Sequence, residues 1–448
     1  MSNKIKELLL IASILTGTIL APINSTMISV ALSSISSYFH ESLANISWVV
    51  TIYLIVMAVT QPIAGKLGDL FGNRNIYMWG LSLFFISSIA CAFSINLSWL
   101  IVFRSLQAVG GALITPNATA IMRHALSKER LPKAFGLFGM GMGLGAAVGP
   151  LLGASLIGEW GWKSIFWVNV PFLFFALLTS IVILPKIQKQ TAVSLDIAGS
   201  IYLAVSFSAL ILLTHRHSLM VYTLIALLFA LFSALFVKRE IQAQVPLIDF
   251  SLFKNHTFLG ANLSILVSNF IMYTTLLMMP LLLEDEFNYS HQTIGWVMAA
   301  FSVSMSLSGW LGGQLTARIG NRKMIAVSFC IAVGSAALYF GLKPVHSLAY
   351  IIIALSVGGI AGGIGSTAMQ TASLESVSKE MSGTASGIYS TFRYFGSMIS
   401  STLVSMLAGS SSLFAVLLVA AILGLIISRL LSNPDISFRR GQTTAKSG

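Results

Sequence analysis

Residues 65–74 read Gly65-Lys66-Leu67-Gly68-Asp69-Leu70-Phe71-Gly72-Asn73-Arg74, and a similar sequence, GQLTARIGNR, lies 248 residues later at residues 313–322. The likeness extends upstream, because residues 46–74 and 294–322 share nine identities in 29 positions without a gap. A chance likeness between two helix connections is the alternative, but nine identities favour an internal repeat. The sequence therefore predicts a chain built from two related halves.

The composition excludes an ordinary soluble protein. Hydrophobic residues make up 56% of the 448 residues and charged residues only 9%, whereas soluble domains carry about 25% charged residues. The mean hydropathy is +0.86. A surface this poor in charge suits a protein that faces lipid. We therefore predict an all-α polytopic membrane protein.

Fourteen apolar runs surround and separate the two copies of the repeat. They cover residues 8–33, 46–66, 76–94, 99–121, 134–157, 164–184, 196–214, 219–237, 258–283, 292–316, 324–342, 347–374, 382–408 and 412–431. The offset of 248 carries the first run onto the ninth, so we expect six spans, two extra spans and six more, with two pseudo-symmetric bundles. The expected domains are an N-terminal bundle at 1–190, two linker helices at 191–240, a C-terminal bundle at 241–432 and a cytoplasmic tail at 433–448.

The basic residues give the expected orientation. The 26 Lys and Arg residues and 14 Asp and Glu residues leave a net charge of +12, but the basic residues form no single patch for nucleic acid. With both termini placed inside, 21 basic residues fall in inner segments, three in outer loops and two, Arg104 and Arg393, within spans. This asymmetry follows the positive-inside rule. We therefore expect both termini in the cytoplasm and no nucleic-acid partner.

The repeated loop has residues suited to gating. Gly65 and Gly72 let helices approach closely, and Asp69 and Arg74 can lock neighbouring helix ends by charge pairing. The second copy has Ala317 in place of the acid. An ordinary capped loop is the alternative interpretation.

Arg104 and Gln107 lie three residues apart in the fourth run and therefore share a helix face. A charge inside a span is costly and usually faces a polar cavity. The alternative is an arginine that reaches back to the membrane interface.

The fifth run contains glycines at a spacing that makes a smooth groove for a partner helix. These residues are Gly136, Gly145, Gly149, Pro150 and Gly153. Pro150 also frees a backbone carbonyl and bends the helix. Generic small-residue packing is the alternative.

These three strings resemble motifs of the major facilitator superfamily: its hallmark loop, its arginine motif of the fourth span and its antiporter motif of the fifth span. Further strings resemble the superfamily's fourteen-span drug:proton antiporters, a family of bacterial multidrug efflux pumps. They are Trp160 to Pro171, Pro246 to Asp249, Leu252 to Asn255 and Ser382 to Gly387 with Arg393 and Gly396. The resemblance implies a major facilitator fold with 14 transmembrane helices in a bacterial cell membrane. It also implies export of amphipathic drugs, such as fluoroquinolones and cationic dyes, driven by proton influx.

One departure concerns the coupling proton. The family's first span usually carries an acidic residue, and this chain has Asn24 there. None of the 14 acidic residues lies mid-span; Glu284, at the outer end of the ninth run, is the deepest, although an ordinary outer-loop acid is the alternative. Proton coupling is therefore implied by the resemblance alone. The candidate coupling and gating residues are Arg104, Asp69, Arg74 and Glu284.

The expected substrate cavity is polar and aromatic, since adaptable side chains suit varied ligands. Its candidate residues are Asn24, Tyr53, Gln61, Gln107, Asn117, Asn269, Tyr273 and Gln370. Each is individually also explained by helix packing. The chain has no nucleotide, metal or nucleophile motif, so we expect no enzymatic activity and no cofactor. We also expect a monomer, whose partners are drugs, protons and lipid. The alternatives are a narrow exporter of tetracycline, a metabolite or a lipid precursor, and a non-transporting membrane sensor.

Overall fold

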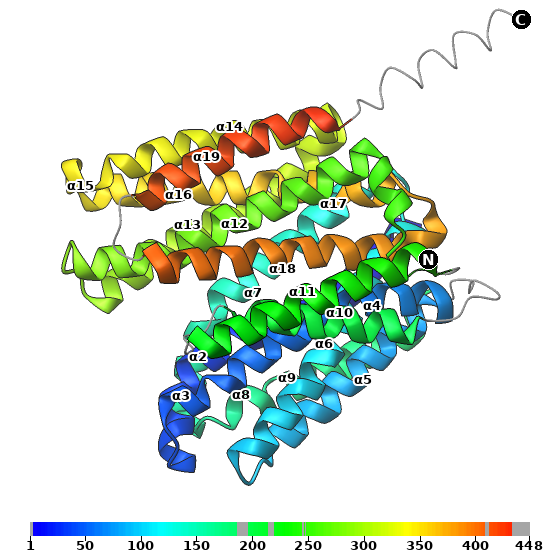
Figure 1. The fold of residues 1–448 in the computed structure, drawn as a ribbon, viewed down its shortest axis with the longest axis horizontal. Coiled ribbons are helices and arrows are strands. Elements are labelled where there is room, and N and C mark those ends of the chain that lie inside the picture. Colours follow the sequence, from blue (N-terminus) through cyan, green and yellow to red (C-terminus); the bar gives the residue numbers. More distant parts are fainter. Residues whose placement is uncertain are drawn as a thin grey trace, which may run out of the picture. The chain divides into compact units, whose positions relative to one another are not determined.

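The structure is a computed structural model that describes residues 3–185, 196–213, 219–243, 246, 248–407 and 412–431. Within these ranges every regular element is a helix (Figure 1). Helices satisfy their own backbone hydrogen bonds, which a lipid environment requires. The expected tail at 433–448 and Arg216, one of the three outer-loop cations, lie outside the described residues.

The helices follow one another from α1 to α19. The first eleven are α1 (Asn3–Thr18), α2 (Leu20–Phe39), α3 (Leu43–Ile46), α4 (Trp48–Phe71), α5 (Asn73–Ala92), α6 (Leu97–Ala125), α7 (Leu131–Trp160), α8 (Ser164–Trp167), α9 (Asn169–Ile183), α10 (Ile197–Leu212) and α11 (Leu219–Gln242). After η1 (Phe250–Lys254) come α12 (His256–Asp285), α13 (His291–Ile319), α14 (Asn321–Phe340), α15 (Leu342–Val345), α16 (Leu348–Ile364), α17 (Ser366–Glu375), η2 (Lys379–Met381), α18 (Ser382–Leu407), α19 (Ser412–Ile427) and η3 (Ser428–Leu430).

Each of the fourteen predicted runs falls on one helix or on a pair of helices. The first run is divided between α1 and α2 at Ile19, the sixth between α8 and α9 at Val168, and the twelfth between α16 and α17 at Gly365. Eleven helical segments of the described residues are long and apolar enough to cross a membrane, and some of them, such as Glu7–Ile28 and Leu348–Glu375, join two of these helices. Val30–Phe39 and Ala198–Leu210 are shorter apolar helical segments. The all-helical membrane fold is therefore confirmed, whereas the count of fourteen spans stays a prediction.

The internal repeat has the same backbone turn in both copies. α4 and α13 end immediately before Gly72 and Gly320, and α5 and α14 begin immediately after them. The two glycines have φ angles of 92° and 86°. Residues with a Cβ rarely adopt such angles, so the glycine of the repeated string is what allows one helix to turn directly into the next.

The chain divides into two compact units whose limits differ from the predicted domains. Unit 1 comprises Met1–Ser127, Gly141–Phe250 and Val377–Tyr394, and unit 2 comprises Lys128–Met140, Ser251–Ser376 and Phe395–Gly448. The start of α7 thus packs in unit 2 and the start of α18 in unit 1. Close glycine contacts explain both exchanges, because a Cβ on Gly136 would lie 2.9 Å from the Gly313 Cα, and one on Gly65 would overlap the Gly383 carbonyl.

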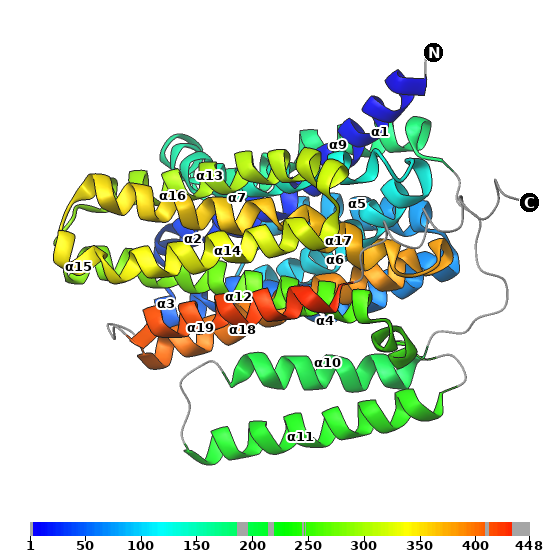
Figure 2. The same cartoon turned by 90° about the horizontal axis from the view of Figure 1, so that it is seen from above.

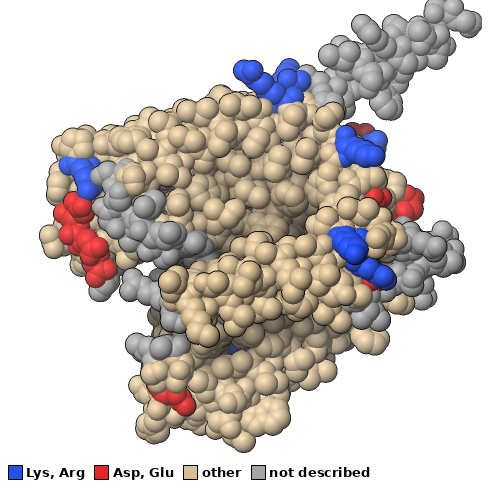
Figure 3. All heavy atoms as spheres, in the orientation of Figure 1, with Lys and Arg blue, Asp and Glu red and all other residues tan. Residues whose placement is uncertain are grey.

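The two linker helices of unit 1, α10 and α11, lie side by side in Figure 2. The hydroxyls of Ser206 and Ser233 are 2.7 Å apart, and Arg239 Nε lies 3.0 Å from Asp196 Oδ2. Burial raises the pKa of the Asp196 carboxyl, but hydrogen bonds from Gly199 and Arg239 outweigh it and hold the pKa below its ordinary value. In Figure 3 the charged side chains gather towards helix ends and leave a broad uncharged surface between them, as contact with lipid requires.

Candidate functional site

Arg104 lies at the centre of a buried polar cluster in unit 1. The side chain is 0% exposed. Its Nη1 donates to Gln107 Oε1 at 2.6 Å and to Asn24 Oδ1, and its Nε donates to the Val49 carbonyl at 3.4 Å. An arginine that reaches back to the interface is therefore excluded. The structure brings together four of the predicted residues, from α2, α4 and α6: Asn24, Tyr53, Arg104 and Gln107.

Aromatic rings complete the surroundings of this guanidinium. Its carbon lies 4.3 Å from the centroid of the Tyr53 ring and 5.9 Å from that of Phe166. Arg104 Nη2 and the Tyr53 hydroxyl have no hydrogen-bond partner among the described residues. None of the described partners of Arg104 is a carboxylate. The cluster is thus a buried cation surrounded by neutral groups.

Gln61 and Asn117 have opposite hydrogen-bonding states. Gln61 is 0% exposed, and neither its amide nitrogen nor its amide oxygen has a partner in the described part of the chain. Asn117 Nδ2 donates to the Ala64 and Leu113 carbonyls, and Asn117 Oδ1 accepts from Asn73 at 3.1 Å. Buried unsatisfied groups call for an explanation. Gln61 therefore suits substrate contact, whereas the bonds of Asn117 suit helix packing.

Asp69, at the end of α4, binds the beginning of α18. Its Oδ1 accepts from the Gly383 backbone N–H, and its Oδ2 accepts from the backbone N–H and hydroxyl of Thr384, all at 2.7 Å. Free N–H groups at a helix N-terminus favour an anion. The carboxylate therefore fastens this segment to α4 within unit 1.

Arg74 binds the C-terminal end of another helix, α9. Its Nη2 donates at 2.7 Å to the carbonyl of Ile181, in the last turn of α9, where a cation is favoured. The expectation that Asp69 and Arg74 lock helices by charge pairing is therefore wrong. Each is bound by backbone groups of another helix, because free helix termini supply both hydrogen bonds and partial charge.

The glycines of α7 contact two different helices. A Cβ on Gly145 would lie 2.9 Å from Ile19 Cγ1, one on Gly149 would overlap the Thr26 hydroxyl, and one on Gly153 would lie 3.0 Å from Val30 Cγ2. These three therefore form a smooth face against α2 and the residue before it, within unit 1. Gly136 packs instead on α13 within unit 2. The Pro150 side chain lies outside what the structure describes.

Gly149→Leu is expected to separate α7 from α2 and to reduce transport about tenfold. The added side chain meets backbone as well as Thr26, and overpacking typically costs about 1–3 kcal/mol. Transport rates in vesicles containing equal amounts of inserted protein measure this. Gly158→Leu is the matched control on the same helix, because nothing lies within 4 Å of its Cβ position. Equal losses in both variants would contradict the helix contact.

The remaining predicted residues belong to unit 2. Asn269 is buried and donates to the Ile265 carbonyl at 3.3 Å, while Gln370 is half-buried. Tyr273 is 36% exposed, and Glu284 is exposed in the last turn of α12. An exposed carboxylate remains hydrated, so this position gives no support to Glu284 as the coupling acid.

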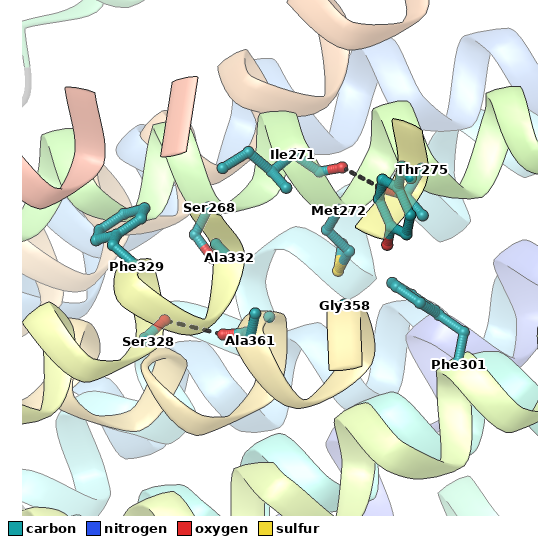
Figure 4. A pocket seen from close by; sticks show the side chains of 12 residues that line it. Ser268, Ile271, Met272, Thr275, Phe301, Ser328, Phe329, Ala332, Gly358 and Ala361 are labelled. Atoms are coloured by element: carbon teal, nitrogen blue, oxygen red, sulfur yellow. Dashed lines mark hydrogen bonds between the residues drawn. The ribbon is translucent and has the colours of Figure 1, made fainter. Parts of the chain in front are cut away.

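Unit 2 also contains a largely apolar cavity between α12, α13, α14 and α16 (Figure 4). Twelve residues line it: Ser268, Ile271, Met272, Thr275, Phe301, Ser328, Phe329, Ala332, Tyr339, Gly358, Ala361 and Gly362. Figure 4 shows that the Ser328 hydroxyl bonds to the Ala361 carbonyl and the Thr275 hydroxyl to the Ile271 carbonyl. The Tyr339 hydroxyl has no partner among the described residues. Because the Ser328 and Thr275 hydroxyls are satisfied and no charged residue lines the cavity, it is a weaker candidate site than the Arg104 cluster.

Several contributing residues were not predicted. Ser88 accepts from Gln107 Nε2 at 2.8 Å, and Phe166 faces the guanidinium. Arg123, at the end of α6, donates to the Ser378 carbonyl at 3.0 Å and to the Ser382 hydroxyl at 3.1 Å. The sequence offered one signal for Arg123, which is a basic residue in the last turn of a long apolar helix. Nothing in the sequence pattern indicates the other contacts, which join segments far apart in the chain.

Comparisons with known proteins agree with this architecture. The family model "Major Facilitator Superfamily" matches residues 14–261 and 261–446. The chain is 52% identical to "Uncharacterized MFS-type transporter YvkA" of Bacillus subtilis (strain 168), over 94% of this chain and 96% of the relative. It is 30% identical to "Multidrug resistance protein Stp" of Mycobacterium tuberculosis (strain CDC 1551 / Oshkosh), over 89% of this chain and 75% of the relative.

A solved structure resembles the fold. The human organic anion transporter MFSD10 (TETRAN) superposes with a TM-score of 0.68 at 14% identity, over 95% of this chain and 99% of that chain. A likeness at this identity shows the fold and nothing about the substrate.

Proposed function

The chain belongs to the Major Facilitator Superfamily, and from this premise we propose that it is a secondary active exporter, which expels amphipathic drugs from a bacterial cell in exchange for protons. It is a multi-pass membrane transporter and not an enzyme. The observation that carries the proposal is the buried cluster of Arg104 and Tyr53, whose unsatisfied polar atoms lie among apolar and aromatic groups. Such a mixture suits ligands with a flat apolar body and few polar groups.

Asp69 is the proposed site of the coupling proton. Among the described residues three carboxylates are buried: Asp69, Asp196 and Glu240. Asp196 pairs with Arg239, and Glu240 accepts from the Ile248 backbone, so both hold the linker region together. Asp69 instead holds the start of α18. A proton on this carboxyl would remove its charge and weaken that attachment, which links proton binding to movement of the segment.

A drug panel tests the proposed function. Full-length protein is expressed in a pump-deficient bacterium, and growth inhibition by fluoroquinolones, acridine dyes and tetracycline is measured with and without an uncoupler. We expect resistance to several unrelated amphipathic drugs, lost when the uncoupler is present. Resistance to a single compound would support the narrow exporter instead, and no change with any compound would contradict drug export.

A further inference from the structure

Arg104 carries a buried charge that the described structure leaves without an anionic partner. Arginine does not deprotonate in proteins, so the charge is present in every state of the cycle. Burial of an ion costs several kcal/mol unless a counter-charge and hydrogen bonds compensate it. Here the compensation comes from the neutral oxygens of Asn24, Gln107 and Val49. The compensation is therefore incomplete.

Two donors of this cluster remain unused. Arg104 Nη2 is fully buried without a partner, and the Tyr53 ring that stacks on the guanidinium carries an unpartnered hydroxyl. A guanidinium presents its N–H groups in a planar fork that matches a carboxylate. Phe166 and Tyr53 add aromatic faces beside that fork. Arg104 Nη2 and the Tyr53 hydroxyl are therefore suited to bind a planar hydrogen-bond acceptor that is attached to an apolar body.

We infer that Arg104 and Tyr53 bind the carboxylate of an amphipathic aromatic substrate, so that this exporter selects substrates with a carboxylate over cations of the same shape. The inference rests on the proposed function and specifies its substrate class. A cationic ligand would add a second positive charge beside an uncompensated one, which low-dielectric surroundings penalise. A carboxylate instead supplies the missing charge and accepts from both unused donors.

Two isosteric substitutions test the charge argument directly. Asn24→Asp and Gln107→Glu each place a carboxylate on an atom that already contacts Arg104 Nη1. Either of these carboxylates would balance the charge of the Arg104 guanidinium. A carboxylate on the substrate would then gain little from binding there. Asn96→Asp is the matched control, because Asn96 is an exposed helix cap, and an aspartate caps a helix equally well.

The probes are 2-naphthoate, 2-naphthamide and 2-naphthamidine, which share one shape and are anionic, neutral and cationic. Their affinities for the purified full-length protein in nanodiscs are measured by calorimetry against protein-free nanodiscs. We expect naphthoate to bind about tenfold or more tightly than naphthamide, as a charge-assisted hydrogen bond predicts, and naphthamidine to bind weakest. Asn24→Asp and Gln107→Glu should abolish this order, and Asn96→Asp should retain it.

Equal binding of the three probes by the unmodified protein would overturn the inference without reference to any variant. Retention of the naphthoate preference in a folded Asn24→Asp or Gln107→Glu protein, judged by an unchanged thermal transition, would also overturn it. Because these measurements detect binding and not export, they stand apart from the drug panel. Naphthoate binding without export would contradict only the proposed function, and export of cations alone would contradict only the inference.

Discussion

Arg104→Met is expected to abolish export of carboxylate drugs while the folded protein remains in the membrane. The guanidinium is the charged member of the buried cluster and has an unused donor. Loss of a hydrogen bond to a charged group costs about 1.5–3 kcal/mol, which corresponds to roughly a 10- to 150-fold loss of transport. Methionine is shorter than arginine, but its unbranched apolar side chain adapts to irregular gaps between groups such as the Tyr53 and Phe166 rings. Uptake of a fluoroquinolone into inverted vesicles, at matched protein amounts, measures the effect.

The same substitution is expected to leave the thermal midpoint of the purified protein within about 4 °C of the original. Replacing buried ions by apolar side chains is often neutral or stabilises by about 1–4 kcal/mol. Against this, the oxygens of Asn24 and Gln107 lose a donor, at about 1–3 kcal/mol each. The two amides can bond each other, which reduces that cost. The gain from removing the buried ion and the cost of the lost hydrogen bonds therefore offset each other.

Lys343→Met is the control for Arg104→Met. Its side chain is 35% exposed and pairs with Glu286, which is 43% exposed, and exposed ion pairs contribute little. We expect this variant to transport normally. Arg104→Met protein with near-normal fluoroquinolone transport would show that the buried charge has no role in substrate handling, and an unfolded protein would show that the charge is structural.

Much of the fold could be predicted from the sequence because membrane insertion and an internal repeat leave strong one-dimensional signals. The 248-residue offset places Asn73 and Asn321 at equivalent positions, and both begin a helix after a glycine turn. The predicted runs differ from the helices mainly where a helix breaks, as at Ile19 and Gly365. Ile19 is itself apolar and gives no signal of a break, whereas Gly365 separates the strongly apolar α16 from the more polar α17, a change that could have indicated the second break.

The site was predictable only where one helix determines it. Helical spacing placed Arg104 and Gln107 on one face, and the structure shows them bonded. Their contact with Asn24 joins residues 80 positions apart, and that of Asp69 with Gly383 joins residues 314 positions apart. Such contacts depend on the packing between helices, which composition and spacing do not specify. The charge-pairing prediction for Asp69 failed for this reason.

Gly65→Val is expected to release the start of α18 from α4 and to stop transport. A Cβ on Gly65 would overlap the Gly383 carbonyl oxygen and lie 2.8 Å from its carbon and 3.2 Å from the Gly387 Cα. These are backbone atoms, so no side chain can rotate away. Separation of the segments would also remove Asp69 from the N–H groups of Gly383 and Thr384. At about 1–3 kcal/mol, the overlap shifts the equilibrium towards the released state roughly 5- to 150-fold.

Thiol labelling measures this release. Ser386→Cys is introduced into a Cys91→Ser, Cys330→Ser protein, because Ser386 is 1% exposed and contacts Thr119. A permeant maleimide should label this cysteine slowly in the parent and faster, by the same 5- to 150-fold, after Gly65→Val. Gly334→Val is the control, since nothing lies within 4 Å of its Cβ position, and it should leave the labelling rate and export unchanged. Slow labelling with full export in Gly65→Val protein would mean that this glycine contact does not hold the segment, and that movement of α18 does not depend on it.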